Sequence, residues 1–336
     1  MDYLFSRYLK PLLLFVFIIT PFITILVFRS NYAIILKGDT LKFESVVEID
    51  TKNEEKGSFS TIYVINMEHS TAFQNALVTG IETVESYEIS YGSTHINDFE
   101  SLAASKIQYY SSIDVSMILA YEEAKKEDNN IYIDYKFSSY DVTYYDRESN
   151  LRIGDKIIGV GEVDNSDIQA LALAINKMNI GDIIHIIRNG NKEDISFNGK
   201  YFNAYARYDI NYDTIKPKAK FSDNMIGGPS GGLLQTLSIY NRLTNTDLTH
   251  GLKIAGTGTI SRNGKVGAIG GIKEKIPTAI DDNIDIFFCV ADNYDDAYKA
   301  YKSLPNSAKM KLIRVETFYD CLNYLKEGYK NDFPNL

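Results

Sequence analysis

A single serine set among glycines constrains this chain of 336 residues more than any other feature. Residues 227–232 read GGPSGG, and Ser230 carries the only hydroxyl there. Because glycine has no side chain, another chain can approach Ser230 closely, and nearby amides can point at a developing negative charge. Apolar side chains then recur at spacings of four and three, the period of an amphipathic helix: Leu233, Leu237, Tyr240 and Leu243. Ser230 is therefore predicted near a helix N-terminus, which suits a bound phosphate or the oxyanion of acyl transfer.

The same pattern has a purely structural interpretation, in which Ser230 caps the helix and the glycines form a turn. A second glycine-rich stretch, GTGTISRNGKVGAIGGIKEKI at residues 256–276, supplies candidate bases for a serine nucleophile. A serine hydroxyl needs such a base, and a lysine amine can act as one once it has lost its proton. Burial in an apolar setting lowers a lysine pKa enough for this. Lys275 has such a setting, with apolar neighbours at helical spacings: Ile272, Ile276, Ala279 and Ile280.

These two stretches resemble the Lon family of serine proteases, which use a Ser-Lys dyad. The proteolytic domain of that family carries a G-P-S-[AG]-G motif and a later G-G-[LIV]-x-x-K motif. Both are present here, as GPSGG at 228–232 and GGIKEK at 270–275. The resemblance implies that Ser230 is the nucleophile and Lys275 the general base. It also selects Lys275 over Lys273. A helical wheel does not distinguish these two lysines, because both lie beside the apolar stripe at similar angles.

The resemblance extends to residues around the dyad. Thr257, in GTGTI, matches a threonine that lies near the lysine in this family, and it is expected to have a supporting role. In the expected mechanism, backbone amides around Gly228 to Ser230, those of Gly228 and Pro229 among them, hold the oxyanion. Neither a metal nor a cofactor is expected, since the four histidines show no metal-ligand spacing. A Ser-His pair using His250 is disfavoured because that histidine lies in the polar loop NTDLTHG.

The N-terminal region predicts a membrane anchor. Residues 11–28, PLLLFVFIITPFITILVF, carry no charge and would reach about 27 Å as a helix, enough to cross a bilayer. A cleaved signal peptide is the alternative, but no small-x-small cleavage site follows. Flanking charges do not decide the orientation. Similarity to membrane-anchored, PDZ-containing Lon-like proteases of Gram-positive bacteria implies a cytoplasmic tail at 1–10 and a catalytic body on the extracellular side of the cell membrane.

Between the anchor and the serine motif, two further regions are expected. Residues 40–127 are predicted to hold two strands, VVEID and STIYVIN, and a helix from residue 98. They are interpreted as the N-terminal part of the protease region, with a simple spacer as the alternative. Residues 128–202 resemble a PDZ domain, because LRIGDKIIGV matches its turn-to-strand signature. A helix capped by Ser166 and a tight hairpin at Asn189-Gly190 are expected to follow.

The carboxylate-binding loop of PDZ domains is absent, so this module is expected to bind an extended segment by strand addition or to cover the active site. Residues 203–332 then complete a Lon-type proteolytic domain. GLKIAGTGTI and the apolar run IDIFFCVA are predicted strands, and ETFYDCLNYLKEGY is a predicted closing helix. The expected fold class is α/β (α+β): a Lon-type domain around one sheet, assembled from both flanks of a PDZ-like insertion and preceded by one transmembrane helix.

The predicted function is that of an ATP-independent, membrane-anchored serine endopeptidase that cleaves exposed segments of secreted or membrane proteins. ATP independence follows from the absence of a G-x-x-x-x-G-K-[ST] loop in the sequence. A non-catalytic PDZ-type peptide receptor is the main alternative. A phosphate-binding loop is disfavoured because no lysine follows Ser230 closely. The net charge of −9, without a basic cluster, excludes nucleic acid as an expected partner. Kinship with Lon also suggests a homo-oligomer.

Overall fold

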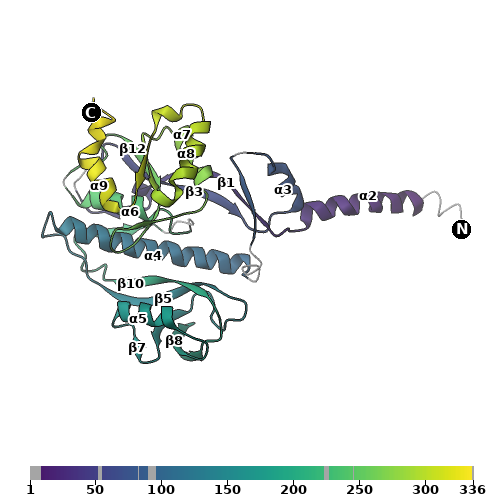
Figure 1. Cartoon of the computed structure of the whole chain (residues 1–336), viewed down its shortest axis with the longest axis horizontal. Helices are drawn as coiled ribbons and strands as arrows, with labels where there is room; N and C mark the ends of the chain where they lie inside the picture. Colours follow the sequence, from purple (N-terminus) through teal and green to yellow (C-terminus); the bar gives the residue numbers. More distant parts are fainter. Residues whose placement is uncertain are drawn as a thin grey trace.

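The computed structural model describes residues 9–51, 55–81, 83–89, 96–222, 227–244 and 246–334. Within these residues the chain is a mixed α/β protein with two larger sheets (Figure 1). The long helix α4 (Asp98–Lys125) lies between them. One sheet, with its helices, lies on the side of the C-terminus, and the other forms a separate module below α4 (Figure 1). The candidate serine and lysine both belong to the layer on the C-terminal side.

The sheet on the C-terminal side joins strands from both flanks of the module. Its order is β16-β15-β12-β3-β1-β4. The bounds are β1 (Tyr32–Lys42), β3 (Ser58–Met67), β4 (Glu85–Glu88), β12 (Lys253–Thr257), β15 (Ile286–Val290) and β16 (Lys311–Val315). The strands β3 and β12 pair in parallel, with Ser60 opposite Ala255. Residues on either side of the module therefore complete one sheet.

Helices cover both faces of this sheet, and its inner strand β15 is apolar throughout. All five residues of β15 are buried, as the run IDIFFCVA predicts. Ile286, Phe288 and Val290 pack in one core with α6 (Gly232–Leu243) and α9 (Phe318–Lys326). Phe287 and Cys289 pack in another with α7 (Ile272–Asp281) and α8 (Tyr294–Ser303). Alternate residues of β15 belong to opposite cores because successive side chains of a strand point to opposite faces of the sheet.

Helix α4 is buried around its whole circumference over Ser111–Tyr121, because both layers pack on it. Its start is fixed by a capping box, in which Asn97 accepts from the Glu100 amide and Glu100 accepts from the Asn97 amide. Short hydroxyl side chains face both layers. Ser111 donates to the Ala206 carbonyl of the module, and Ser116 donates to the Gly232 carbonyl of α6. The helix predicted from residue 98 is thus confirmed, and it connects the module to the helix that follows Ser230.

The module consists of a sheet in the order β10-β5-β6-β8-β9, with β7 paired to β6. Its bounds are β5 (Tyr135–Tyr145), β6 (Lys156–Val160), β7 (Val163–Asp164), α5 (Ile168–Lys177), β8 (Ile183–Arg188), β9 (Asn191–Ser196) and β10 (Phe202–Ile210). The hairpin at Asn189-Gly190 is confirmed, with φ of 51° and 82° at its two central residues. The cap of α5 was predicted one residue early, because Asp167 and not Ser166 accepts from the first amides.

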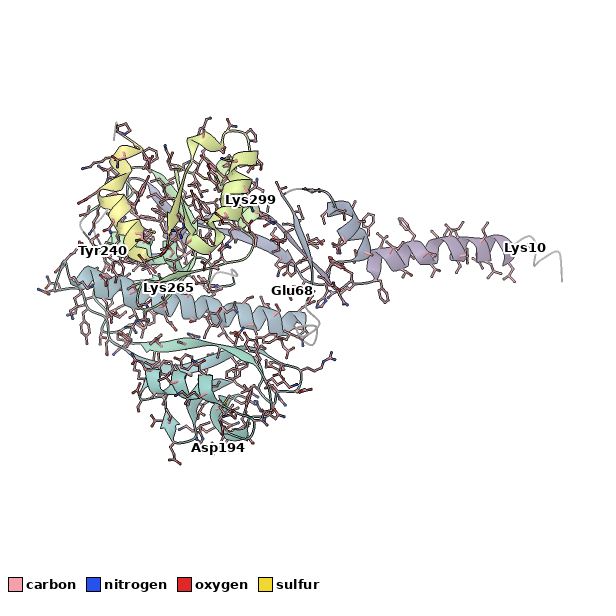
Figure 2. All side chains as sticks on the ribbon, viewed as in Figure 1. Lys10, Glu68, Asp194, Tyr240, Lys265 and Lys299 are labelled. Atoms are coloured by element: carbon pink, nitrogen blue, oxygen red, sulfur yellow. The ribbon has the colours of Figure 1, made fainter. Side chains whose placement is uncertain are left out.

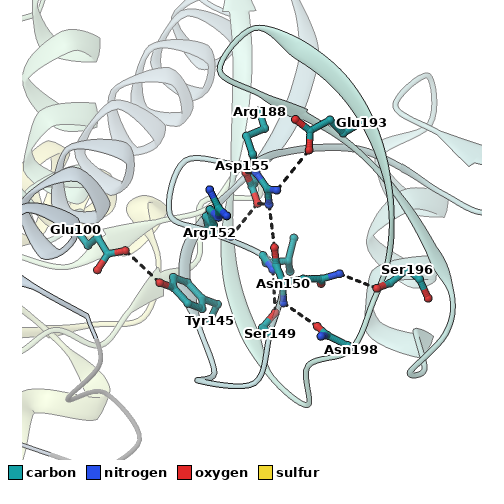
Figure 3. Close-up of polar contacts among 11 residues, drawn as sticks. Glu100, Tyr145, Ser149, Asn150, Arg152, Asp155, Arg188, Glu193, Ser196 and Asn198 are labelled. Atoms are coloured by element: carbon teal, nitrogen blue, oxygen red, sulfur yellow. Dashed lines mark hydrogen bonds and ion pairs between the residues drawn. The ribbon is translucent and has the colours of Figure 1, made fainter.

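A buried ion pair holds the turn of the LRIGD stretch. Arg188 donates to both carboxylate oxygens of Asp155, at 2.8 and 2.6 Å, and to the Asn150 carbonyl (Figure 3). Such a two-point contact fixes the guanidinium plane as well as the distance. On the other side of the module, the Tyr145 hydroxyl donates to Glu100 at the start of α4 (Figure 3). These contacts are interior to the module or join it to α4. The PDZ assignment and the domain limits stay predictions, and β10 continues the sheet beyond residue 202.

Smaller elements complete the description. They are η2 (Phe43–Ser45), β2 (Val47–Ile49), α3 (Ala72–Val78), β11 (Ala219–Phe221), β13 (Thr259–Ile260), β14 (Val266–Gly267), η4 (Ala291–Asn293), η5 (Ser307–Lys309) and η6 (Gly328–Asn331). The predicted strands VVEID and STIYVIN correspond to β2 and β3, but β2 pairs with β11 while β3 joins the six-stranded sheet. The strand β1 was not predicted.

The transmembrane helix predicted over residues 11–28 is not found. No helix in the described part of the chain is both long and apolar enough to cross a membrane. The helix at this place, α2 (Lys10–Val27), has 18 residues. It begins with a charged lysine and contains Pro21. The helix projects from the rest of the chain, and most of its described side chains are exposed (Figure 2).

The contact of α4 with the module predicts which ion pair matters for stability. Asp114, on α4, accepts from Arg207 Nε at 2.6 Å and from the Tyr208 amide, and it is almost fully buried. Asp114→Ala leaves the Arg207 guanidinium and the Tyr208 amide without their acceptor. We therefore expect the free energy of unfolding, measured by urea denaturation, to fall by roughly 3 kcal/mol. Lys136→Ala breaks the exposed pair with Asp209 and is expected to cost less than about 1 kcal/mol. Equal losses in the two variants would contradict this account.

Candidate active site

Ser230 lies in the turn directly before α6, with Gly231 as the N-cap residue. The turn needs its glycines for two different reasons. Gly228 has a φ of +85°, which a residue with a side chain rarely adopts. Gly232 allows close approach: a Cβ atom there would lie 2.7 Å from Ser112 Oγ and 2.8 Å from Ile260 Cγ2. The first turn of α6 is therefore held tightly between α4 and β13, and this fixes Ser230.

Lys275 lies in the first turns of α7, which starts after Gly271 in the left-handed conformation. Its side chain is 1% exposed, and its Nζ lies 3.0 Å from Ser230 Oγ and 3.0 Å from Thr257 Oγ1. Lys273, the competitor left open by the helical wheel, is exposed. The structure thus brings together the serine, the lysine and the threonine that the motifs single out, from three separate elements.

Burial sets the charge of the lysine. Three of the four apolar side chains expected beside Lys275 belong to a buried core, and the fourth, Ile280, packs against it. This desolvation lowers the pKa of Lys275 from 10.5 to about 7. No carboxylate of the described residues forms an ion pair with its amine, which would raise the pKa again. The neighbouring Glu274 is also buried, and burial raises the pKa of its carboxyl.

The low pKa of Lys275 has a consequence for folding. Between about pH 7 and 10.5 the unfolded chain holds a proton on this amine that the folded chain does not. The contribution of Lys275 to stability therefore rises with pH across this window. Below it, the folded protein must bury a charged ammonium. Lys275 therefore destabilises the folded protein most below about pH 7, where its amine is protonated and is also unable to accept a proton.

Thr257 orients the lysine amine. Its hydroxyl donates to the Ser230 carbonyl at 3.2 Å, so only its lone pairs remain to accept a hydrogen bond from Lys275. When the amine is neutral, one N–H donates to Thr257 and the nitrogen lone pair can point at Ser230 Oγ. The Ser230 hydroxyl can then donate its proton to Lys275 Nζ. The threonine sits at the end of β12, whose neighbours on both sides are strands of the sheet. It therefore provides a rigid support for Nζ.

The oxyanion donors predicted at Gly228 and Pro229 are wrong. Proline has no backbone N–H and cannot donate a hydrogen bond. The Gly228 amide already donates to the Ser105 carbonyl of α4 at 2.9 Å. The amides of Ser230 and Gly231 have no acceptor among the described residues, whereas the next amide, of Gly232, donates to the Pro229 carbonyl. Ser230 and Gly231 are therefore the amides left to bind an anionic oxygen.

A cavity of about 290 Å³ opens beside Ser230 and Lys275. Its other lining comes mainly from η2, β1, β3, β4, α4 and α6. Most of it is apolar or aromatic: Ile35, Leu41, Phe43, Val46, Ile62, Tyr63, Val64, Tyr87 and Tyr109, with Thr61, Asn66, Ser112 and Gln235 as polar members. These residues were missed by the motif analysis, because they come from distant segments with no shared pattern. A larger cavity, of about 610 Å³, lies elsewhere on α7 and contains neither member of the dyad.

The remaining candidates are not part of this site. His250 stacks on Tyr329, with ring centres 3.9 Å apart, and its Nε2 contacts the Leu325 carbonyl. It belongs to the packing of α9 and not to a Ser-His pair. His95 lies outside the described residues. The described part of the chain contains no group of three or more histidine, cysteine or acidic side chains that could hold a metal ion.

Comparison with known proteins connects this geometry to a family. Residues 222–326, which include Ser230, Thr257 and Lys275, match the Lon protease (S16) C-terminal proteolytic domain. The Lon protease of Campylobacter concisus is 34% identical over 121 residues, and that of Neorickettsia sennetsu is 34% identical over 97 residues. The matches cover 35% and 29% of this chain, which spans only 14% and 11% of those proteins. Both comparisons support a serine peptidase.

The buried amine predicts an unusual lysine titration. In protein labelled at lysine Cε, we expect one NMR signal to titrate with a pKa of about 7 and to vanish in Lys275→Met. A lysine in water has a pKa of about 10.4, and the signal that titrates near pH 7 should persist in the control Lys273→Met. If the signal assigned to Lys275 titrated with the surface lysines, burial would not control its charge.

Proposed function

We propose that the chain is a serine endopeptidase in which Ser230 is the nucleophile and Lys275 the general base. The observation that carries the proposal is the 3.0 Å contact between Nζ of a fully buried lysine and Oγ of a serine beside a cavity. A pKa of about 7 leaves roughly half of the amine neutral at pH 7, compared with a very small fraction for a lysine in water. The pair is therefore suited to base catalysis at neutral pH.

The proposed reaction has two steps. Neutral Lys275 accepts the Ser230 proton as Oγ attacks the peptide carbonyl carbon, and the amides of Ser230 and Gly231 bind the resulting oxyanion. The carbon–nitrogen bond then breaks, and the protonated lysine gives its proton to the leaving amine. In the second step Lys275 accepts a proton from water, whose oxygen attacks the ester carbon. The ester breaks, Ser230 regains its proton, and the acid product leaves. Thr257 supports both steps by holding Nζ in place.

The proposed substrates are exposed or unstructured peptide segments, cleaved without ATP. Two features support this: the sequence contains no G-x-x-x-x-G-K-[ST] loop, and the cavity beside Ser230 is small. The PDZ-like module is proposed to influence access to the site, because α4 contacts it on one side and α6 on the other. The assembled dyad favours a peptidase over the non-catalytic receptor. The extracellular location and the homo-oligomer stay predictions from the resemblance.

Single substitutions in the dyad test the proposed function. With an unstructured polypeptide as substrate, we expect Ser230→Ala and Lys275→Met each to lower kcat by roughly 10³-fold or more. Methionine fills the apolar site of the lysine without a charge, so Lys275→Met should remain folded, as thermal unfolding would show. The matched control Lys273→Met changes an exposed lysine two residues away and should retain activity within about twofold.

Product mapping by mass spectrometry decides between the two candidate functions. New termini that appear with the native chain and disappear with Ser230→Ala are the expected result. If peptides bound but no bond was cleaved by the native chain, the receptor would be the better account. Cleavage that survived Ser230→Ala would assign the nucleophile elsewhere.

A further inference from the structure

Gln235 is a buried polar residue that the proposed reaction does not use. It lies on α6, is 2% exposed, and lines the same cavity as Ser230 and Lys275. Its Nε2 has no hydrogen-bond partner among the described residues. A buried donor left unpaired costs about 1–3 kcal/mol, and folded proteins seldom retain one without a reason. An acceptor supplied by a molecule in the cavity would satisfy it.

The helix period shows which way Gln235 faces. Gln235 follows Gly231 by four residues, and its amide donates to the Gly231 carbonyl, so both lie on one face of α6. A Cβ atom on Gly231 would lie 3.1 Å from Thr61 Oγ1 and 3.6 Å from Phe43 Cζ. Thr61 and Phe43 line the cavity as well. The face of α6 that carries Gln235 is therefore turned toward η2 and β3, the wall opposite the helix.

The surroundings of Gln235 determine what it can recognise. The nearby walls are apolar or aromatic, including Leu41, Phe43 and Val46, which suits the body of a large side chain. Ser112, a polar group of α4 in the same cavity, contacts the Pro229 carbonyl. Gln235 thus adds an unused donor to a mainly apolar cavity. A ligand that matches both features has an apolar body and a hydrogen-bond acceptor at its end.

We propose that Gln235 is a specificity-determining residue of this peptidase. It donates a hydrogen bond from Nε2 to the side chain of the residue whose carbonyl Ser230 attacks. The cavity then selects a long side chain with a terminal oxygen, such as tyrosine, over one that is purely apolar, such as phenylalanine. The inference rests on the proposed function and adds the class of substrate residue to it.

Two matched peptides test the inference. They share a sequence that the native chain cleaves and differ only by tyrosine or phenylalanine before the scissile bond. For the native chain we expect kcat/KM to be roughly 3- to 10-fold higher for tyrosine, the effect of one hydrogen bond. Gln235→Met keeps an unbranched side chain of similar length but has no donor. In this variant the ratio should fall to one or below, because the buried tyrosine hydroxyl loses its partner.

Ser238→Ala is the control for a general effect of α6. Ser238 is also buried on α6 and its Oγ has no partner among the described residues, but it does not line the cavity. Its substitution should leave the tyrosine-to-phenylalanine ratio unchanged. A native ratio of one, or an equal shift in Ser238→Ala, would overturn the assignment of Gln235 whether or not the Gln235→Met protein folds.

Ser230→Ala separates the two levels of the proposal. If both peptides are cleaved by the native chain and neither by Ser230→Ala, the proposed function holds. The role of Gln235 then depends only on the ratio of kcat/KM for the tyrosine and phenylalanine peptides. If the native chain shows no cleavage of either peptide that depends on Ser230, the proposed function and the inference fail together.

Discussion

The burial of one lysine amine is the constraint on which the site depends. An ammonium in water is a poor base at neutral pH, and the fold changes this by packing Lys275 among isoleucines without a carboxylate partner. The same packing positions Nζ 3.0 Å from Ser230 Oγ. Desolvation and proximity are therefore provided by a single structural feature. Its stability cost is greatest at acidic pH, where the amine would be charged inside the protein.

The architecture explains how three small segments meet. Ser230 precedes α6 on one face of the sheet, Lys275 lies on α7 on the other, and Thr257 ends the strand β12 between them. The strand β3, from before the module, pairs with β12 and completes the wall of the cavity. On the outer side of α6, helix α4 contacts both Gly232 and the module. The module thus contacts the scaffold of Ser230 through α4, and Arg262, which follows β13, adds a direct contact by donating to the Tyr135 hydroxyl of β5.

Sequence patterns predicted the parts of this structure that are encoded locally. The helix α4, the strand β15 and the hairpin at Asn189-Gly190 each follow from period or turn chemistry within one short segment. The grouping of Ser230, Thr257 and Lys275 came from two family motifs. The choice between Lys273 and Lys275 needed that resemblance too, because helical spacing alone places both at the edge of the apolar stripe.

The parts that were missed depend on contacts between distant segments or on details of single atoms. The cavity walls come from elements far apart in the sequence, and no local pattern marks Phe43 or Gln235 as neighbours. The strand β1 begins a few residues after the apolar helix α2. Its apolar residues were therefore not recognised as a separate strand. Pro229 belongs to the serine motif but has no N–H, and the Gly228 amide is occupied by Ser105. Residue type alone is enough to exclude Pro229, whereas the contact that occupies the Gly228 amide is seen only in the structure.

The most direct test of the central claim is the pH dependence of Ser230 modification by a fluorophosphonate, followed by mass spectrometry of the intact protein. If the buried lysine is the base, the second-order rate should rise from acid to alkaline pH with one apparent pKa of about 7 and then level off. The rise should be absent in Lys275→Met. A native rate that is flat down to about pH 4, or that still increases above about pH 9, would contradict control of Ser230 by a neutral, buried lysine.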